Sequence, residues 1–153
     1  MANSFSQMPT HVVTAVKYRQ ALILPDWREY LHRYITGIFT NQGLRLLQVN
    51  SMPDHMHILF ESKPNCCVSD IMRVVKAAST RWINQQKYTQ AHFQWQEGNG
   101  VFNLGRKDVP VVAAYIQNQQ TQHRKETFRE EFLRVCREEE VDFDPQYIFH
   151  ESL

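Results

Sequence analysis

The chain lacks the features that organise several classes of protein. It has three cysteines in 153 residues, with Cys66 and Cys67 adjacent and Cys136 far along the chain. This odd count without a CxxC pair argues against a disulfide framework or a cysteine-based metal site, and indicates a reduced, cytoplasmic setting. No apolar run approaches membrane-spanning length, and residues 1–9 lack the basic start and apolar stretch of a signal peptide. We therefore expect a soluble protein with no membrane partner.

The chain also lacks an excess of charge of one sign. With 17 Lys and Arg against 16 Asp and Glu, the composition alone does not indicate nucleic-acid binding. No repeat or low-complexity tract divides the sequence, and its length suits a single domain over residues 1–153. The acidic residues gather late, where a solvated helix face is expected. They are Glu130, Glu131, Glu138, Glu139, Glu140, Asp142 and Asp144.

Hydrophobic periodicity predicts an alternation of strands and helices. Gly43 is expected to end the first helix, and Ser69 to cap the second. The β-α-β-β-α-β order indicates an α+β fold of ferredoxin-like or RRM-like type, an antiparallel sheet with helices packed on one face, plus a C-terminal helix that carries Tyr115. The other, exposed face would carry the histidines. Strands are expected at 12–17, 45–50, 56–61 and around 100–103, and helices at 26–40, 69–86, 109–119 and about 127–139.

The most informative motif is His55-Met56-His57, which follows a Pro53-Asp54 turn. Alternate side chains of a strand share a face, so both imidazoles point the same way while Met56 points into the core. Two imidazoles on one face of a rigid strand form half of a metal site. By itself, the pair is equally compatible with two polar residues on the solvated face of a strand.

A second motif lies farther along the chain. Asp108 is an expected N-cap and Pro110 falls in the first turn, so a helix is predicted to begin here. On this helix Tyr115 and Gln119 are four residues apart and share a face. The spacing would present a phenol nucleophile beside an amide-oxygen ligand, although a core tyrosine and a surface amide show the same spacing.

Together these motifs resemble the single-tyrosine HUH transposases, small insertion-sequence enzymes that act on single-stranded DNA. The resemblance runs over nearly the whole chain, from His11-Val12-Val13 through Trp95-Gln96-Glu97-Gly98 to Tyr147-Ile148-Phe149. One departure is Gln122-His123, where many relatives carry paired histidines. The roles of these two residues stay open.

The resemblance implies a DNA transposase that cleaves and rejoins single-stranded DNA by metal-assisted transesterification. Tyr115 would form a 5′-phosphotyrosine intermediate, and His55, His57 and Gln119 would hold a divalent Mg or Mn ion. Without an anionic ligand, that ion would act on the phosphate with its charge largely undiminished. The resemblance also implies DNA hairpins at the element ends, and a homodimer whose active sites are shared by exchange of the Tyr115 helix about a hinge at residues 103–107.

DNA contacts are expected from cations and small polar groups, because phosphate oxygens supply most nucleic-acid affinity. An ordinary solvated face has the same composition. Exposed Phe93 or Trp95 would be able to stack on unpaired bases. The second helix is expected to bury the stripe Ile71, Val74, Val75, Ala78 and Trp82. The candidate contacts are Arg73, Lys76, Thr80 and Asn84 on that helix, Lys17 and Arg19 before it, and Arg106, Lys107, Arg124 and Lys125 after it.

Two questions stay open at this point. Asp54 either orients an imidazole or serves as a turn residue, and the turn is slightly favoured. The function has two alternatives: an HUH nickase of replication-initiator, relaxase or domesticated repeat-processing type, and a non-catalytic RRM-like nucleic-acid-binding module. The extent of the resemblance favours the transposase.

Overall fold

The expected strands and helices are all present in the computed structural model, which describes residues 6–123 and 126–142. Arg124, Lys125 and Tyr147 lie outside these residues. The strands are β1 (Pro9–Ala15), β2 (Arg45–Met52), β3 (His55–Glu61) and β4 (Gly100–Asn103). The helices are α1 (Pro25–Asn41), α2 (Val68–Gln86), α3 (Val109–Gln117), α4 (Gln119–Gln122) and α5 (Phe128–Glu138), with two 3-10 turns, η1 (Lys17–Arg19) and η2 (Arg106–Asp108).

The four strands form one antiparallel sheet in the order β2-β3-β1-β4. A tight turn joins β2 to β3, so that Met52 pairs with His55. On the other side of β3, Ala15 pairs with His55 and Val13 with His57. Both histidines therefore lie on an inner strand, and the strand order with two β-α-β connections confirms the predicted ferredoxin-like α+β fold.

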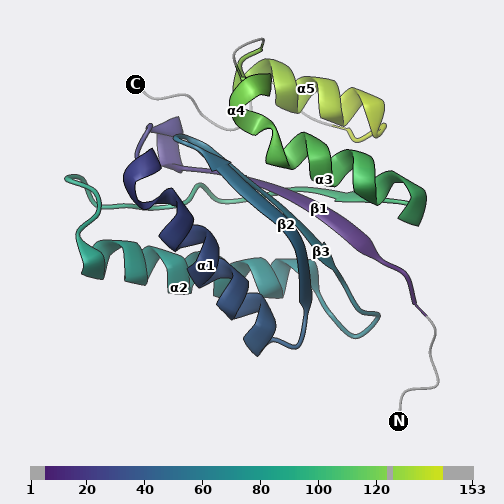
Figure 1. Ribbon diagram of the computed structural model, residues 1–153, viewed down its shortest axis with the longest axis horizontal. Helices are drawn as coiled ribbons and strands as arrows, with labels where there is room; N and C mark the ends of the chain where they lie inside the picture. The colour runs from purple at the N-terminus through teal and green to yellow at the C-terminus, as the bar shows by residue number, and fades with distance from the viewer. Residues whose placement is uncertain (1–5, 124–125, 143–153) are drawn as a thin grey trace.

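Helices α1 and α2 cover one face of the sheet and enclose the main core (Figure 1). As predicted, Met56 points into this core and is fully buried. Gly43, at φ +71°, follows the end of α1 and adopts a backbone that favours glycine. Each large apolar side chain buried here stabilises the fold by about 1.5–3 kcal/mol relative to its exposure.

The opposite face of the sheet is also covered, by α3, α4 and α5 (Figure 1). The expectation of an exposed histidine face is therefore wrong, because His55 is 0% and His57 1% exposed. Phe128 and Val135 of α5 form a second apolar cluster with Val13 and with Phe102 of β4. Amphipathic α5 needs an apolar surface to bury this stripe, and the sheet supplies it.

Three local expectations about α2 and the segment that follows it are wrong. Ser69 lies inside α2, whose N-cap is Cys67 and makes no side-chain capping bond. Val74 is 38% exposed rather than in the core. Phe93 and Trp95 are buried and unable to stack on bases, because they pack in the main core, where the Trp95 indole donates to Ser79 Oγ at 2.9 Å.

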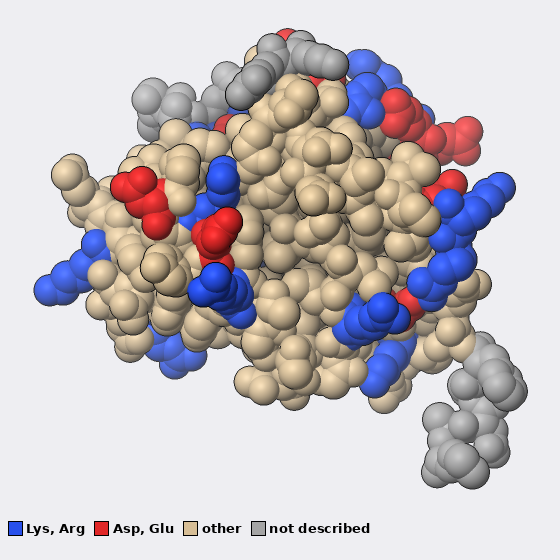
Figure 2. All heavy atoms as spheres, viewed as in Figure 1, with Lys and Arg blue, Asp and Glu red and all other residues tan. Residues whose placement is uncertain are grey.

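The surface shows no large patch of one charge on the face seen in Figure 2, where Lys and Arg lie mostly around the rim beside Asp and Glu. Any DNA-binding surface must therefore be found from local geometry rather than from net charge. Across residues 6–123 and 126–142, no helix is long and apolar enough to cross a membrane.

Candidate functional site

The paired histidines of β3 point into the space between the sheet and α5. His55 Nδ1 lies 2.7 Å from Asp54 Oδ1, and His57 Nδ1 lies 2.8 Å from His11 Nε2. Each ring is thus oriented through one nitrogen, which leaves Nε2 of both histidines to face the same point. The prediction that the alternation of β3 brings the two imidazoles together is confirmed.

Glu131 of α5 occupies the point on which these nitrogens converge. Its Oε1 lies 3.1 Å from His57 Nε2, 3.2 Å from His123 Nε2 and 3.5 Å from His55 Nε2. Its Oε2 accepts a hydrogen bond from Gln119 Nε2 at 3.0 Å. The carboxylate is 1% exposed and is the hub of the site.

Tyr115 and Gln119 reach the same carboxylate from two short helices rather than from one. Helix α3 ends at Gln117, Asn118 leaves helical geometry, and α4 begins at Gln119. The Tyr115 hydroxyl nevertheless donates to Glu131 Oε2, and Gln119 Oε1 lies 3.3 Å from His55 Nε2. The structure therefore brings both predicted residues to the histidine pair.

A guanidinium also contacts the tyrosine. Arg134 Nη2 donates to the Tyr115 hydroxyl oxygen at 3.0 Å and stacks over its ring at 5.5 Å. The same Nη2 atom also donates to Glu126 Oε1 at 2.8 Å. The phenol oxygen is thus fixed between one anion and one cation.

Electrostatics follow from burial and from these partners. Burial alone would raise the pKa of Glu131, but the imidazoles of His123, His55 and His57 outweigh it and hold the pKa well below its usual range. Burial, followed by the charge of Glu131, raises the pKa of Tyr115. Tyr115 is therefore a neutral phenol in this arrangement, with Glu131 as the acceptor of its hydrogen bond.

The two metal-candidate histidines differ in protonation tendency. Burial would lower the pKa of His55, but hydrogen bonds to Asp54 and then Glu131 outweigh it, so the pKa is raised. Burial lowers the pKa of His57, and burial reinforced by His57 lowers that of His11 to about 3. A neutral His11 pairs with His57 without adding charge beneath the site.

The donor atoms here fit a divalent cation. Donor atoms of His55, His57 and Glu131 all lie within 4.8 Å of one another. Adjacent ligands on one ion with bonds near 2.1 Å stand roughly 3 Å apart, close to the spacings found among these atoms. Two imidazoles with amide and carboxylate oxygens suit first-row divalent ions and tolerate Mg.

Glu131 is the candidate site residue that sequence reasoning missed. Its place among the late acidic residues predicts a solvated helix face, which is correct for exposed Glu130 and wrong for Glu131. The missed signal is its helical spacing, three residues after Phe128 and four before Val135, which places a carboxylate on the apolar stripe. The structure thus places a carboxylate beside the three predicted ligands, where the sequence alone indicated none.

Asp54 does more than form the turn. Besides its bond to His55, its Oδ2 lies 3.1 Å from Arg19 Nη2, and the guanidinium stacks on Phe128 at 4.9 Å. Arg19 therefore lies beside the histidines, and its predicted DNA contact stays a prediction. Asp108 is the N-cap residue of α3, as expected, but its side chain makes no capping bond.

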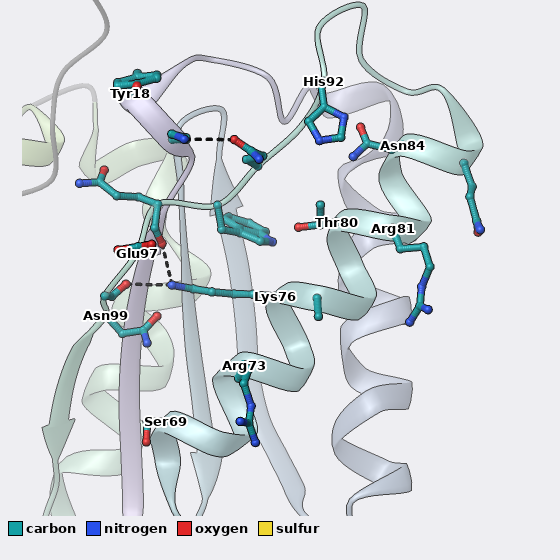
Figure 3. Close-up of a pocket in the computed structure, with 17 residues that line it drawn as sticks. Tyr18, Ser69, Arg73, Lys76, Thr80, Arg81, Asn84, His92, Glu97 and Asn99 are labelled. Atoms are coloured by element: carbon teal, nitrogen blue, oxygen red, sulfur yellow. Dashed lines mark hydrogen bonds between the residues drawn. The ribbon is translucent and has the colours of Figure 1, made fainter.

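Five of the other predicted DNA contacts line one groove between α2 and residues 92–99 (Figure 3), whereas Arg106 and Lys107 lie in η2 and are not among its lining residues. Two of them hold the wall of this groove. Lys76 Nζ donates to the carbonyls of Gln96 and Gly98 at 2.8 and 2.9 Å, and both amide atoms of Asn84 bond the backbone of Phe93. The members of the predicted set in the groove are Lys17, Arg73, Lys76, Thr80 and Asn84.

Known proteins with similar sequences are transposases. The family described as "Transposase IS200 like" matches residues 4–119. The chain is 29% identical over 75 residues to the ISDra2 transposase TnpA of Deinococcus radiodurans, covering 49% of this chain and 54% of that protein. It is 28% identical over 115 residues to the transposase for insertion sequence element IS200 of Salmonella typhimurium, covering 71% and 74%. The chain thus spans about half the length of the first relative.

Solved structures with the same fold include two proteins of low sequence identity. A crystal structure of a candidate transposase from Deinococcus radiodurans has a TM-score of 0.62 at 22% identity, covering 78% of this chain and 95% of that one. A REP-associated tyrosine transposase bound to a REP hairpin has a TM-score of 0.61 at 15% identity, covering 80% and 73%. Helix α5 and Glu131 follow residue 119, where the family match ends.

Proposed function

Because the chain belongs to the IS200-like transposase family, we propose that it cleaves and rejoins single-stranded DNA through a covalent bond between Tyr115 and a 5′-phosphate. The observation that carries this proposal is the convergence of the Tyr115 hydroxyl and the Nε2 atoms of His55 and His57 on one buried carboxylate. A nucleophile and a cation-binding pair within one cluster are the two parts that phosphodiester transesterification needs.

His55, His57 and Gln119 are the proposed ligands of a Mg or Mn ion, with the Glu131 carboxylate as a further oxygen donor. A divalent ion held there supplies positive charge to a scissile phosphate. Asp54 and His11 fix the ring orientations of His55 and His57, as hydrogen bonds to ligand imidazoles commonly do.

The proposed reaction begins with a neutral phenol. When Tyr115 attacks phosphorus, its proton leaves through Glu131 Oε2, the atom that already accepts its hydrogen bond, and passes on to water because the pKa of that carboxyl is depressed. Arg134, on the other side of the phenol oxygen, favours the negative charge that develops there. The attack breaks the bond from phosphorus to the 3′-oxygen of the preceding nucleotide, and that oxygen takes a proton from water and leaves as a 3′-hydroxyl. Attack by a 3′-hydroxyl on the phosphotyrosine reverses the step and rejoins ends without ATP.

Helix α5 controls access to this chemistry. The Nε2 atoms lie beneath Glu131 and Phe128, whose ring stacks on His55 at 4.0 Å. A scissile phosphate reaches the histidines only when α5, or the segment from α3 to α4, moves outward, and Glu131 and Arg134 act on Tyr115 once these helices have closed over the bound phosphate. Exchange of the Tyr115 helix between two subunits would be such a movement. In the single chain described, Tyr115 lies beside His57 of the same chain, and the shared-site homodimer stays a prediction.

The proposed partner is single-stranded DNA carrying a hairpin. The solved REP-associated relative is described with a hairpin bound, which supports the same class of ligand here. The exposed cations of the groove beside α2 supply a surface for phosphate contact.

The test is the covalent adduct on a denaturing gel, with labelled single-stranded DNA that carries the hairpin-forming ends flanking the gene. We expect Tyr115→Phe to abolish the adduct while DNA binding stays near the wild-type level, because only the nucleophilic oxygen is lost. Tyr18→Phe and Tyr34→Phe are matched controls that should retain it. An adduct in the Tyr115→Phe protein would refute this nucleophile, and wild-type protein that binds DNA without any adduct would favour the RRM-like binding module.

A further inference from the structure

The groove beside α2 is large enough for a short stretch of polymer. Its volume is about 1330 Å³, above the range of roughly 300–1,000 Å³ that suits one small molecule. One wall is α2, the other is the segment of residues 92–99, and η1 closes the end nearest Tyr18 (Figure 3). A groove of this size between two walls has room for a strand that passes through.

Three cationic side chains with exposed heads line the groove: Lys17, Arg73 and Arg81. Arg73 has only a solvent-exposed pair with Asp70 at 3.4 Å, and Lys17 reaches the Gln94 amide oxygen at 3.3 Å. Within the described residues, Arg81 has no hydrogen bond or ion pair. These heads are available to phosphate oxygens, whereas the Lys76 ammonium is held by two backbone carbonyls.

An aromatic ring stands at the end of this row of cations. Tyr18 is 44% exposed and its ring projects outward at the η1 end of the groove (Figure 3). Its backbone is left-handed, at φ 58°, and so is that of Arg19, at φ 51°. Non-glycine residues rarely adopt this conformation, and such outliers gather at functional sites. Here they turn Tyr18 outward while Arg19 turns inward to Asp54.

This turn connects the groove to the histidine pair. Lys17 and Tyr18 line the groove, and the next residue, Arg19, binds Asp54, which in turn binds His55. A strand lying in the groove therefore comes to the edge of the histidine site at η1.

We propose that this groove binds an unpaired stretch of the DNA strand, with one base stacked on Tyr18 and phosphates contacted by Lys17, Arg73 and Arg81. The proposal rests on the proposed action on single-stranded DNA and adds where the strand lies and which groups hold it. Stacking on an aromatic ring is available only to an unpaired base and accepts any base, so binding here should prefer single strands and tolerate sequence.

The chain offers a matched control for the cation–aromatic pair of the groove. Lys17 lies 5.5 Å from the Tyr18 ring, and Arg33 lies 6.0 Å from the ring of Tyr30, which is 54% exposed on α1 and away from the groove. Substitutions at Tyr30 and Arg33 remove the same phenol and guanidinium groups as substitutions at Tyr18 and Arg81, without touching the groove.

The test measures fluorescence anisotropy of labelled oligodeoxythymidine, alone and annealed to oligodeoxyadenosine, with the folded state of each variant checked by circular dichroism. Tyr18→Ala should weaken single-strand binding by roughly 5- to 150-fold, Tyr18→Phe should bind nearly as wild type, and neither should affect duplex binding. Arg81→Gln should reduce the slope of log affinity against log salt by about 0.7, the value for one lost phosphate contact on a single strand. Tyr30→Ala and Arg33→Gln should change neither measurement.

Wild-type affinity in Tyr18→Ala, or an equal loss in Tyr30→Ala, would overturn the groove assignment. A second measurement replaces one thymine by 5-iodouracil and locates the cross-link by mass spectrometry. We expect the peptide that carries Tyr18, and a cross-link confined to peptides outside the groove would also overturn the proposal. The adduct assay on the same proteins separates the groove assignment from the proposed function. If wild type forms the adduct and Tyr18→Ala binds single strands as wild type does, only the groove assignment is refuted. If wild type forms no adduct, the proposed function is refuted.

Discussion

The sharpest prediction concerns Glu131, which α5 places over the histidine pair. Glu131→Gln keeps the shape of the side chain and removes its charge. In the wild type this buried carboxylate accepts from Gln119 at 3.0 Å and from His57 at 3.1 Å, besides the Tyr115 hydroxyl. Removing one partner from a buried charged cluster costs about 3–5 kcal/mol. We expect a loss of that size in the free energy of unfolding.

The measurement is urea unfolding at pH 7 with a chelator present, followed by circular dichroism. The adjacent Glu130→Gln variant is the control, because Glu130 is exposed and should change the free energy of unfolding by less than about 0.5 kcal/mol. A Glu131→Gln protein as stable as the Glu130→Gln control would refute the hub role of this carboxylate.

The depressed pKa of Glu131 predicts that the difference in the free energy of unfolding between wild type and Glu131→Gln depends on pH. The pKa of Glu131 in the folded chain lies below its usual value of 4.5, so the unfolded chain binds more protons as the pH falls through that value. The stability that this carboxylate supplies is therefore complete above about pH 5 and is lost progressively on further acidification. The difference between wild type and Glu131→Gln should shrink below pH 4.5, and a difference that grows there would contradict the depressed pKa.

Three further predictions concern the ligands, the subunits and an unrelated histidine. Mn²⁺ binding measured by calorimetry should be lost in His57→Ala and only weakened in Gln119→Ala, because imidazole binds such ions more firmly than an amide oxygen. Added Mn²⁺ should restore adduct formation to Gln119→Ala alone. Equal loss in both variants without rescue would count against this ligand set. A mixture of His57→Ala and Tyr115→Phe chains should recover adduct formation if sites are shared between subunits. Co-purification of size-tagged chains verifies that heterodimers have formed. Verified heterodimers that remain inactive would refute the exchange. Burial lowers the pKa of His32 from 6.5 to about 4, so the unfolded chain binds more protons between pH 6.5 and pH 4. The free energy of unfolding of the wild type should therefore fall by up to ~3 kcal/mol on acidification from pH 6.5 to pH 4. In urea unfolding at pH 6.5 and pH 4, the free energy of unfolding of His32→Asn should fall by less than that of the wild type. An identical fall in the two proteins would show that His32 is not buried in its neutral form.

Local sequence determined where the helices and strands form and, in β3, which face of the sheet each side chain occupies. The strict alternation of β3 sends Met56 into the core and both histidines to the other side, because side chains of a strand alternate. Pro25 in the first turn of α1 and Gly43 after it mark that helix through backbone geometry alone. These patterns operate over a few residues, so the fold class and the histidine pair were predictable from them.

Only the tertiary structure decided what covers the histidines and what completes their site. The spacing of Glu131 within α5 shows an acidic residue on an apolar stripe, but nothing local states which surface that stripe meets. Likewise, Lys76 and Asn84 read as DNA contacts, yet carbonyls and amides of residues 93–98 engage them because that segment folds back on α2. Contacts between residues distant in sequence depend on how whole elements pack, and packing is settled by burying all apolar faces at once. The sequence by itself therefore specified the two imidazoles and the tyrosine, while packing of α5 on the sheet supplied the carboxylate that joins them.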